Sequence, residues 1–391
     1  MTASLSESRL LHARLAVLVA FFINGALIAS WVSRIPAVQT RLGLSEGGLG
    51  FVLLGVAAGT LVALSLAGGL IARYGSPNVT LFGALVMSAF LVIIPLAPNA
   101  VLLWIVLFVF GGAMSVMDVA MNEQAVLVER HARKPLMSSF HASFSIGGFA
   151  GALIGAGMAS MALTPLIHFA IMGLAFGILI FFVIPRLIPT AREAKESGGS
   201  VFRLPERALW LLGAVAFCSA IGEGAMADWS AVYLHQVLGT TTAYAALGFA
   251  AFSLTMTIGR LIGDSLSARF QPAWIVRTGG AAAALGVLAA VLTNEPVVAL
   301  VGFAAVGIGL ANIVPLAFSA SGNRPGISPS VGIAGVATIG YAGFLAGPPV
   351  IGLIAEATSL RVALLLVAIL VGSVIFTAQA MNPVEPEEPQ G

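Results

Sequence analysis

Charged residues and cysteines are scarce in this sequence. Charged residues occupy 9% of the 391 positions and hydrophobic residues 59%, with a mean hydropathy of +1.03, whereas a typical soluble domain is about a quarter charged. This composition excludes a cytosolic enzyme, a disordered chain and a soluble domain held by a single membrane anchor. The one cysteine, Cys218, excludes an internal disulfide bond and a multi-cysteine metal site.

Basic blocks and nucleotide-binding motifs are also missing. The net charge is +2 and the arginines are spread along the chain, so no nucleic-acid partner is expected. There is no Walker-type GxxxxGK(S/T) motif, so we expect neither direct drive by ATP nor any cofactor. His141 and Ser145 lie one helical turn apart, but no third orienting group accompanies them, and we do not expect an enzyme.

Long apolar runs make up most of the chain. A membrane-spanning helix needs about 20 apolar residues, and these runs lack the short alternation of outer-membrane strands. They predict twelve spans. The predicted spans are 13–34, 47–71, 78–97, 101–127, 137–162, 166–185, 207–234, 243–268, 273–292, 296–319, 331–355 and 360–380.

One polar stretch divides the spans into six and six. Residues 186–206 contain glycine and serine and carry charges of both signs, which is typical of a linker. The sequence therefore predicts an N-terminal six-helix bundle (1–185) and a C-terminal six-helix bundle (207–380). The proline-rich acidic tail (381–391) is expected to be disordered.

Lysine and arginine predict the orientation, because cytoplasmic loops carry the excess of these residues. With a cytoplasmic N-terminus, the outside holds Arg34, Arg41 and Arg361. The cytoplasmic side then holds Arg9, Arg14, Arg73, Arg130, Arg133, Lys134, Arg186, Arg192, Lys195, Arg203, Arg207, Arg269 and Arg324. We therefore expect both termini and the linker in the cytoplasm.

The two halves match each other at a single offset. Gly307 lies 196 residues after Gly111, and the same offset aligns several other positions. Because six spans return the chain to its starting side, the halves form a parallel repeat. The other aligned positions are Leu42-Gly43 with Leu238-Gly239, Leu70–Tyr74 with Leu266–Phe270, and Gly147 and Gly151 with Gly343 and Gly347.

The loop after the second span resembles a signature of the major facilitator superfamily. It reads Gly68-Gly-Leu70-Ile-Ala72-Arg73-Tyr-Gly75 against the family's G-x-L-a-D-R-x-G. It departs from the signature at Ala72, where the family usually has Asp, so the charge relay attributed to that loop is not expected to transfer. The resemblance covers the whole chain. It implies an all-α membrane protein with twelve transmembrane helices, in two parallel-repeat six-helix bundles around a central cavity.

Two further stretches resemble the fucose-permease-like symporters and the YbjJ-type permeases of bacterial inner membranes. Asp118-x3-Asn122 is similar to an acid-x3-Asn pattern of the first group, and His141-x2-Phe144-x2-Gly147-Gly148 also occurs in relatives of that branch. The resemblance implies an inner (plasma) membrane location, import of solute, and a coupled proton on Asp118. The first span carries Asn24 where the fucose permease has an acid, so fucose itself is not expected.

Ionisable residues inside a span are costly and usually face the bundle interior. Asp118 lies near the middle of the fourth span with Asn122 on the same face, and Glu223 is its counterpart in the seventh. Because burial favours the neutral form of a carboxylic acid, Asp118 and Glu223 are the candidates for proton coupling. The alternative for each is a structural carboxylate that bonds to a neighbouring helix.

Two pairs of opposite charges are candidate gates. Arg34 and Asp228 lie at similar depth in the first and seventh spans, and we expect them to pair when the cavity faces inward. The alternatives for Arg34 are an interfacial anchor or a contact to an anionic solute. Arg260 and Asp264, four residues apart, are expected to pair as a structural or inner-gate lock.

Aromatic, amide and imidazole side chains are the candidates for solute binding, because a sugar-like solute needs flat apolar contact and a few oriented hydrogen bonds. The alternative for Trp31 and Trp229 is the interfacial aromatic belt, and for His141 it is packing. Gly347-Pro348-Pro349 is expected to kink or break the eleventh span. The candidates are Asn24, Trp31, Asn122, His141, Asn312 and Tyr341.

Together these features predict a secondary transporter that imports a small polar organic solute by alternating access, with proton coupling. The alternative is a proton-coupled exporter of a metabolite or drug. The expected partners are the solute, the proton and the lipid bilayer. A monomer is expected because two bundles enclose their own pathway.

Overall fold

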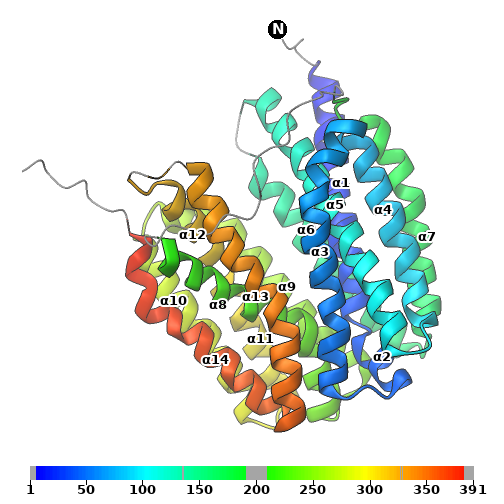
Figure 1. Cartoon of the computed structure of the whole chain (residues 1–391), viewed down its shortest axis with the longest axis vertical. Helices are drawn as coiled ribbons and strands as arrows, with labels where there is room; N and C mark the ends of the chain where they lie inside the picture. The colour runs from blue at the N-terminus through cyan, green and yellow to red at the C-terminus, as the bar shows by residue number, and fades with distance from the viewer. Residues whose placement is uncertain (1–5, 134–135, 191–208, 326, 328, 383–391) are drawn as a thin grey trace, which may run out of the picture.

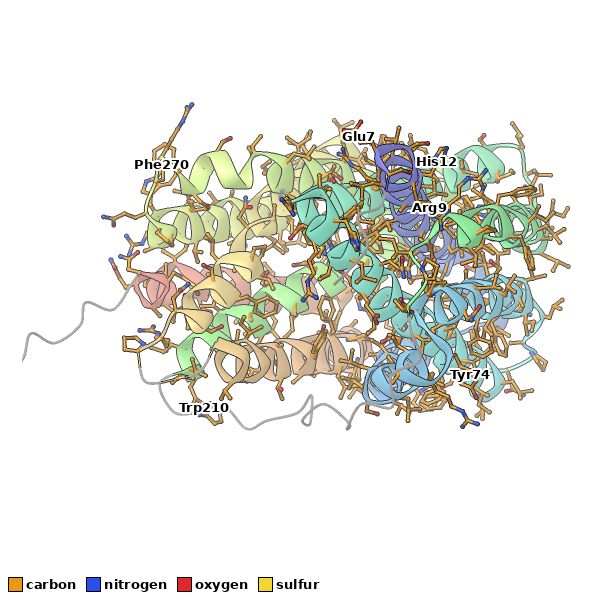
Figure 2. All side chains as sticks on the ribbon, turned by 90° about the horizontal axis from the view of Figure 1, so that it is seen from above. Glu7, Arg9, His12, Tyr74, Trp210 and Phe270 are labelled. Atoms are coloured by element: carbon orange, nitrogen blue, oxygen red, sulfur yellow. The ribbon has the colours of Figure 1, made fainter. Side chains whose placement is uncertain are left out.

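The computed structural model describes residues 6–133, 136–190, 209–325, 327 and 329–382. Within these ranges every regular element is helical, and twelve helical stretches are long and apolar enough to cross a membrane. The predicted all-α fold with twelve spans is confirmed. Viewed from the end at which the N-terminus lies, the two bundles stand side by side (Figure 2).

Two spans are interrupted, so the twelve spans contain fourteen α-helices. The first is interrupted at Ser33 and Arg34 and the tenth at Ala311 and Asn312. The helices (Figure 1) are α1 Glu7–Val32, α2 Ile35–Leu42, α3 Glu46–Tyr74, α4 Ser76–Ile93, α5 Ala100–Ala132, α6 Met137–Ser160, α7 Pro165–Val183, α8 Trp210–Val232, α9 Thr242–Ser267, α10 Pro272–Leu292, α11 Pro296–Leu310, α12 Ile313–Gly322, α13 Pro329–Ala357 and α14 Leu360–Thr377.

Polar caps mark the start of several spans. The side chains of Ser45, Asn99, Thr164 and Ser359 each accept a hydrogen bond from the backbone N–H three residues later. Each bond satisfies one of the four N–H groups that a helix leaves free at its N-terminus. Between these caps the helices are apolar on most sides, as segments surrounded by lipid and by other helices should be.

The internal repeat is visible in the helix packing. A Cβ atom on Gly111 of α5 would lie 2.3 Å from the carbonyl oxygen of Val56 on α3, and one on Gly307 of α11 would lie 2.2 Å from that of Phe252 on α9. Phe252 follows Val56 by 196 residues, the offset that separates the two glycines. The same close helix pair therefore occurs in both bundles.

The two bundles approach each other closely at one end of the molecule. A Cβ atom on Gly50 of α3 would lie 2.7 Å from the carbonyl oxygen of Pro348 on α13. Between the bundles, the Ser253 hydroxyl of α9 donates a hydrogen bond to the Ser145 carbonyl of α6 at 3.2 Å. Figure 1 shows α3 and α13 converging away from the N-terminus and standing apart at the end where the N-terminus lies.

The sequence predicts a kink or a break at Gly347-Pro348-Pro349. The break is wrong, because α13 runs through both prolines as one helix, and the kink remains a prediction. Proline removes a backbone hydrogen bond, but α13 is packed against α8 on one side and α3 on the other. That packing holds the helix together where its own hydrogen bonds are missing.

The structure does not describe the centre of the predicted linker or most of the tail. Residues 191–208 and 383–391 lie outside the described ranges. The linker at 186–206, the tail at 381–391 and the domain boundaries drawn from them remain predictions.

Gly111→Ala tests the close contact between α5 and α3. The added methyl group would meet the Val56 carbonyl, and overpacking of this kind costs about 1–3 kcal/mol. We expect a lower melting temperature for the purified protein in detergent. Gly69→Ala is the matched control, because nothing lies within 4 Å of a Cβ atom there. Equal melting temperatures for the two variants would contradict the packing described here.

Candidate functional site

A cavity lies between the two bundles. It consists of two adjoining pockets of about 380 Å³ and 510 Å³, within the range of small-molecule sites. The pockets share Glu223, Arg260, Tyr341 and Phe344. The first is lined by α1, α3, α5 and α6 of the N-terminal bundle and by α8, α9 and α13 of the C-terminal bundle. Both halves of the repeat therefore surround one space.

Asp118 of α5 lines the first pocket, as predicted. Its carboxylate Oδ1 accepts a hydrogen bond from the Asn122 amide at 3.2 Å, and the same amide donates to the Asp118 carbonyl at 2.9 Å. Asn122 does not line either pocket. In this structure Asn122 therefore positions the Asp118 side chain, and its role as a solute contact remains a prediction.

Asn24 of α1 lies next to the same part of α5. Its amide nitrogen donates to the Met114 carbonyl at 3.3 Å, one turn before Asp118. Asn24 is buried and lines the first pocket, and its Oδ1 atom has no hydrogen-bond partner among the described residues. That oxygen is a free acceptor for a donor group on a solute.

Glu223 and Arg260 form an ion pair inside the cavity. Arg260 Nη2 of α9 lies 3.6 Å from Glu223 Oε2 of α8, and both side chains line both pockets. The predicted partner of Arg260 was Asp264, whose side chain lies outside the described part of the structure. Arg260 reaches across to a neighbouring helix, a contact that same-helix spacing could not indicate, and its pairing with Asp264 remains a prediction.

The predicted ion pair between Arg34 and Asp228 is not formed in this conformation. Arg34 is buried at the break between α1 and α2 and donates to the Leu163 carbonyl, within its own bundle. Its burial also excludes an anchor at the lipid surface. Asp228 of α8 lines the first pocket and makes no hydrogen bond or ion pair with any described residue.

Trp31 of α1 is 1% exposed and lines the first pocket, as predicted. Trp229 of α8 is also fully buried but lines neither pocket. The alternative of an interfacial belt requires contact with the membrane surface, and burial excludes it for both residues.

The three remaining candidates line the cavity. Tyr341 of α13 faces both pockets, and His141 of α6 and Asn312 face the second. The His141 ring packs edge-on against Phe21 with 5.3 Å between ring centroids. Asn312 sits at the break before α12 and donates to the Gly259 carbonyl at 3.0 Å, so its amide also stabilises the interrupted span.

Several lining residues were missed by sequence reasoning. On α9 the spacing of Phe249, Phe252, Met256 and Arg260 puts these side chains on one helix face, and that periodicity was the available signal. Among the described residues no group of three or more metal-ligating side chains occurs. The missed lining residues include Thr60, Ser115, Phe144, Ser145, Phe249, Phe252, Ser253, Met256 and Phe344.

Relatives of known sequence match nearly the whole chain. It is 36% identical to the uncharacterized transporter y4wD of Sinorhizobium fredii over 376 residues, covering 96% of this chain and 99% of the relative. It is 35% identical to an uncharacterized MFS-type transporter of Yersinia pestis over 364 residues, covering 93% and 94%. It is 34% identical to the membrane protein MosC of Rhizobium meliloti over 371 residues, covering 93% and 88%.

Solved structures share the fold. The nucleoside transporter NupG aligns with a TM-score of 0.75 at 15% identity, covering 94% of this chain and 98% of that one. A bacterial homologue of the human lysosomal transporter Spinster, inward-facing and occupied, aligns with a TM-score of 0.74 at 15% identity, covering 96% and 97%. A family model described as Major Facilitator Superfamily matches residues 15–326. The chain therefore belongs to the major facilitator superfamily and is a secondary transporter that works by alternating access.

Proposed function

We propose that this transporter couples the movement of a small polar organic solute to the movement of protons, with Asp118 as the proton-carrying residue. The observation that supports the proposal most is the charge balance in the cavity. Glu223 is paired with Arg260, whereas the Asp118 carboxylate makes no ion pair with a described residue. Its side-chain partner is the neutral amide of Asn122. A neutral donor can bond to the carboxyl group in either protonation state, so a proton can leave or return without breaking a salt bridge.

The cost of a buried charge provides the coupling. A carboxylate is tolerated while the cavity is open to water, but closing both ends around it removes its solvation at a cost of several kcal/mol. A bound proton removes the charge. The bundles can then exchange between their two arrangements when Asp118 is neutral, and the population of each state follows the proton and the solute together.

The orientation predicted from arginine and lysine assigns the two ends of the cavity. The end where α3 meets α13 then faces outside, and the end where the bundles separate faces the cytoplasm. On this assignment the structure represents an inward-facing state. The proposed location is the inner membrane, and the proposed direction of solute transport is import. We also propose that a single chain is the working unit, because residues from its own two bundles surround the cavity.

Export by proton exchange is the second candidate. The first pocket has largely apolar and aromatic walls, which suits a more apolar compound. The direction of net solute movement under an imposed pH gradient distinguishes the two: an importer accumulates solute on the side to which protons run, and an exporter accumulates it on the opposite side.

Asp118→Asn is expected to abolish proton flux while preserving the fold. Asparagine has the same size as aspartic acid but cannot release a proton in this range. The measurement is solute-driven proton movement in liposomes that contain the purified protein and a pH-sensitive dye. The probes are pools of sugars, amino sugars, polyols, organic acids and nucleosides. We expect at least one pool to drive proton movement through the wild type. The rate for the variant should be at least about tenfold lower, equivalent to about 1.4 kcal/mol.

Glu295→Gln is the matched control for this experiment, because Glu295 is exposed at the start of α11 and lies outside both pockets. It should respond like the wild type. Undiminished proton flux in the Asp118→Asn variant would show that Asp118 is structural and would transfer the proposed role to Glu223.

The ion pair between Glu223 and Arg260 predicts measurable coupling between these side chains. Removing one partner leaves the other charge uncompensated in the cavity, while removing both does not. We expect Glu223→Gln and Arg260→Gln each to lower the melting temperature. The fall in melting temperature of the double variant should be smaller than the sum of the two single falls. For a partly exposed pair the coupling should be about 0.5–1 kcal/mol. Strictly additive losses in this double-mutant cycle would show that the pair contributes nothing.

A further inference from the structure

The charges that line the cavity do not balance. Among the described side chains, the two pockets hold three carboxylates, those of Asp118, Glu223 and Asp228, and one guanidinium, that of Arg260. Arg260 is committed to Glu223 at 3.6 Å. If Asp118 carries the transported proton, as proposed above, Asp228 remains as a carboxylate with no counter-charge.

The surroundings of Asp228 offer it no partner. Arg34, the nearest candidate from the sequence, donates to the Leu163 carbonyl instead. Asp228 lines the first pocket and has no hydrogen bond or ion pair with a described residue. Closing the cavity would take this half-buried carboxylate out of water without a partner, at a large cost in free energy, and a positively charged group on a solute would remove that cost.

The walls of the same pocket suit a cation. Trp31 of α1 lies at the depth of Asp228 in the repeat, because Ala227 follows Trp31 by the repeat offset of 196 residues. Aromatic faces attract ammonium groups within about 6 Å of the ring centroid. The aromatic residues that line the first pocket are Trp31, Phe144, Phe249, Phe252, Tyr341 and Phe344.

The same features argue against an anionic solute. The other ionisable lining groups are His141 of α6 and Tyr341 of α13, neither of which is a permanent cation. An anion would have to displace Glu223 from Arg260 and would leave that carboxylate unpaired. It would also approach the negative faces of the aromatic rings.

We propose that the solute is a small polar amine, whose protonated amino group is bound by Asp228 and the aromatic walls. The free Oδ1 atom of Asn24 then accepts a hydrogen bond from an uncharged polar group of the solute. Asp118 and Asp228 thus have separate roles, the first for the proton and the second for the solute cation. This assignment rests on the proposed function for the role of Asp118, but its test does not require proton transport.

The test is binding of matched pairs of amines and neutral analogues to the purified full-length protein in detergent at neutral pH, by isothermal titration calorimetry. The pairs are glucosamine against glucose, N-methylglucamine against sorbitol, and ethanolamine against ethanediol. Because a hydrogen bond to a charged group is stronger than one between neutral groups, at least one amine should bind about tenfold or more tightly than its analogue, equivalent to about 1.4 kcal/mol. In Asp228→Asn that preference should fall to about twofold or less.

Two variants separate this inference from the proposed function. Asp118→Asn should keep the preference for the amine while losing proton flux, and Glu295→Gln should keep both. Size-exclusion chromatography and circular dichroism establish that each variant is folded. The inference is overturned if no amine binds, if neutral analogues bind equally well, or if folded Asp228→Asn keeps the preference. Amine binding without any proton flux would uphold the inference and refute the proton coupling.

Discussion

The cost of placing a charge among apolar helices is the constraint on which this structure depends. Asp118, Glu223, Asp228 and Arg260 lie in membrane-spanning helices, and all four line the cavity between the bundles. A charged side chain at the centre of a bilayer costs at least about 2.5–3.5 kcal/mol, so these groups are tolerated where water or solute can reach them. A cavity that closes must therefore first neutralise its charges, and in the proposed function this requirement couples the solute and the proton to the change of conformation.

Alternating access also requires rigid cavity walls, and close packing of the helices within each bundle supplies them. Gly111 and Gly307 bring helix backbones into contact at equivalent places in the two halves, so each bundle can move as a unit. The contacts between bundles are of another kind. They include a backbone approach between Gly50 and Pro348 and the hydroxyl hydrogen bond from Ser253. Contacts of this kind can separate without leaving a charge unpaired.

The sequence was sufficient to predict which stretches form spans but not which partner each polar side chain meets. Hydropathy predicted twelve spans, and the polar residues expected to face the bundle interior, Asp118 and Glu223, line the cavity. The pairing of Arg34 with Asp228 failed because the break after α1 turns the arginine into its own bundle. Arg260 reached Glu223 on another helix, a contact that spacing along one helix cannot reveal. Trp31 and Tyr341 were predicted, but the phenylalanine walls were missed because, among 23 phenylalanines, a single one carries no signal and only the spacing of several along α9 does.

The central claim is that Asp118 exchanges a proton while it faces the cavity, and infrared titration of the protein in lipid tests it most directly. The measurement follows the C=O stretching band of protonated carboxylic acids as the pH is lowered through neutrality. The account predicts a band in the wild type that is lost in Asp118→Asn and retained in Glu223→Gln. A band that persists unchanged in Asp118→Asn would contradict it.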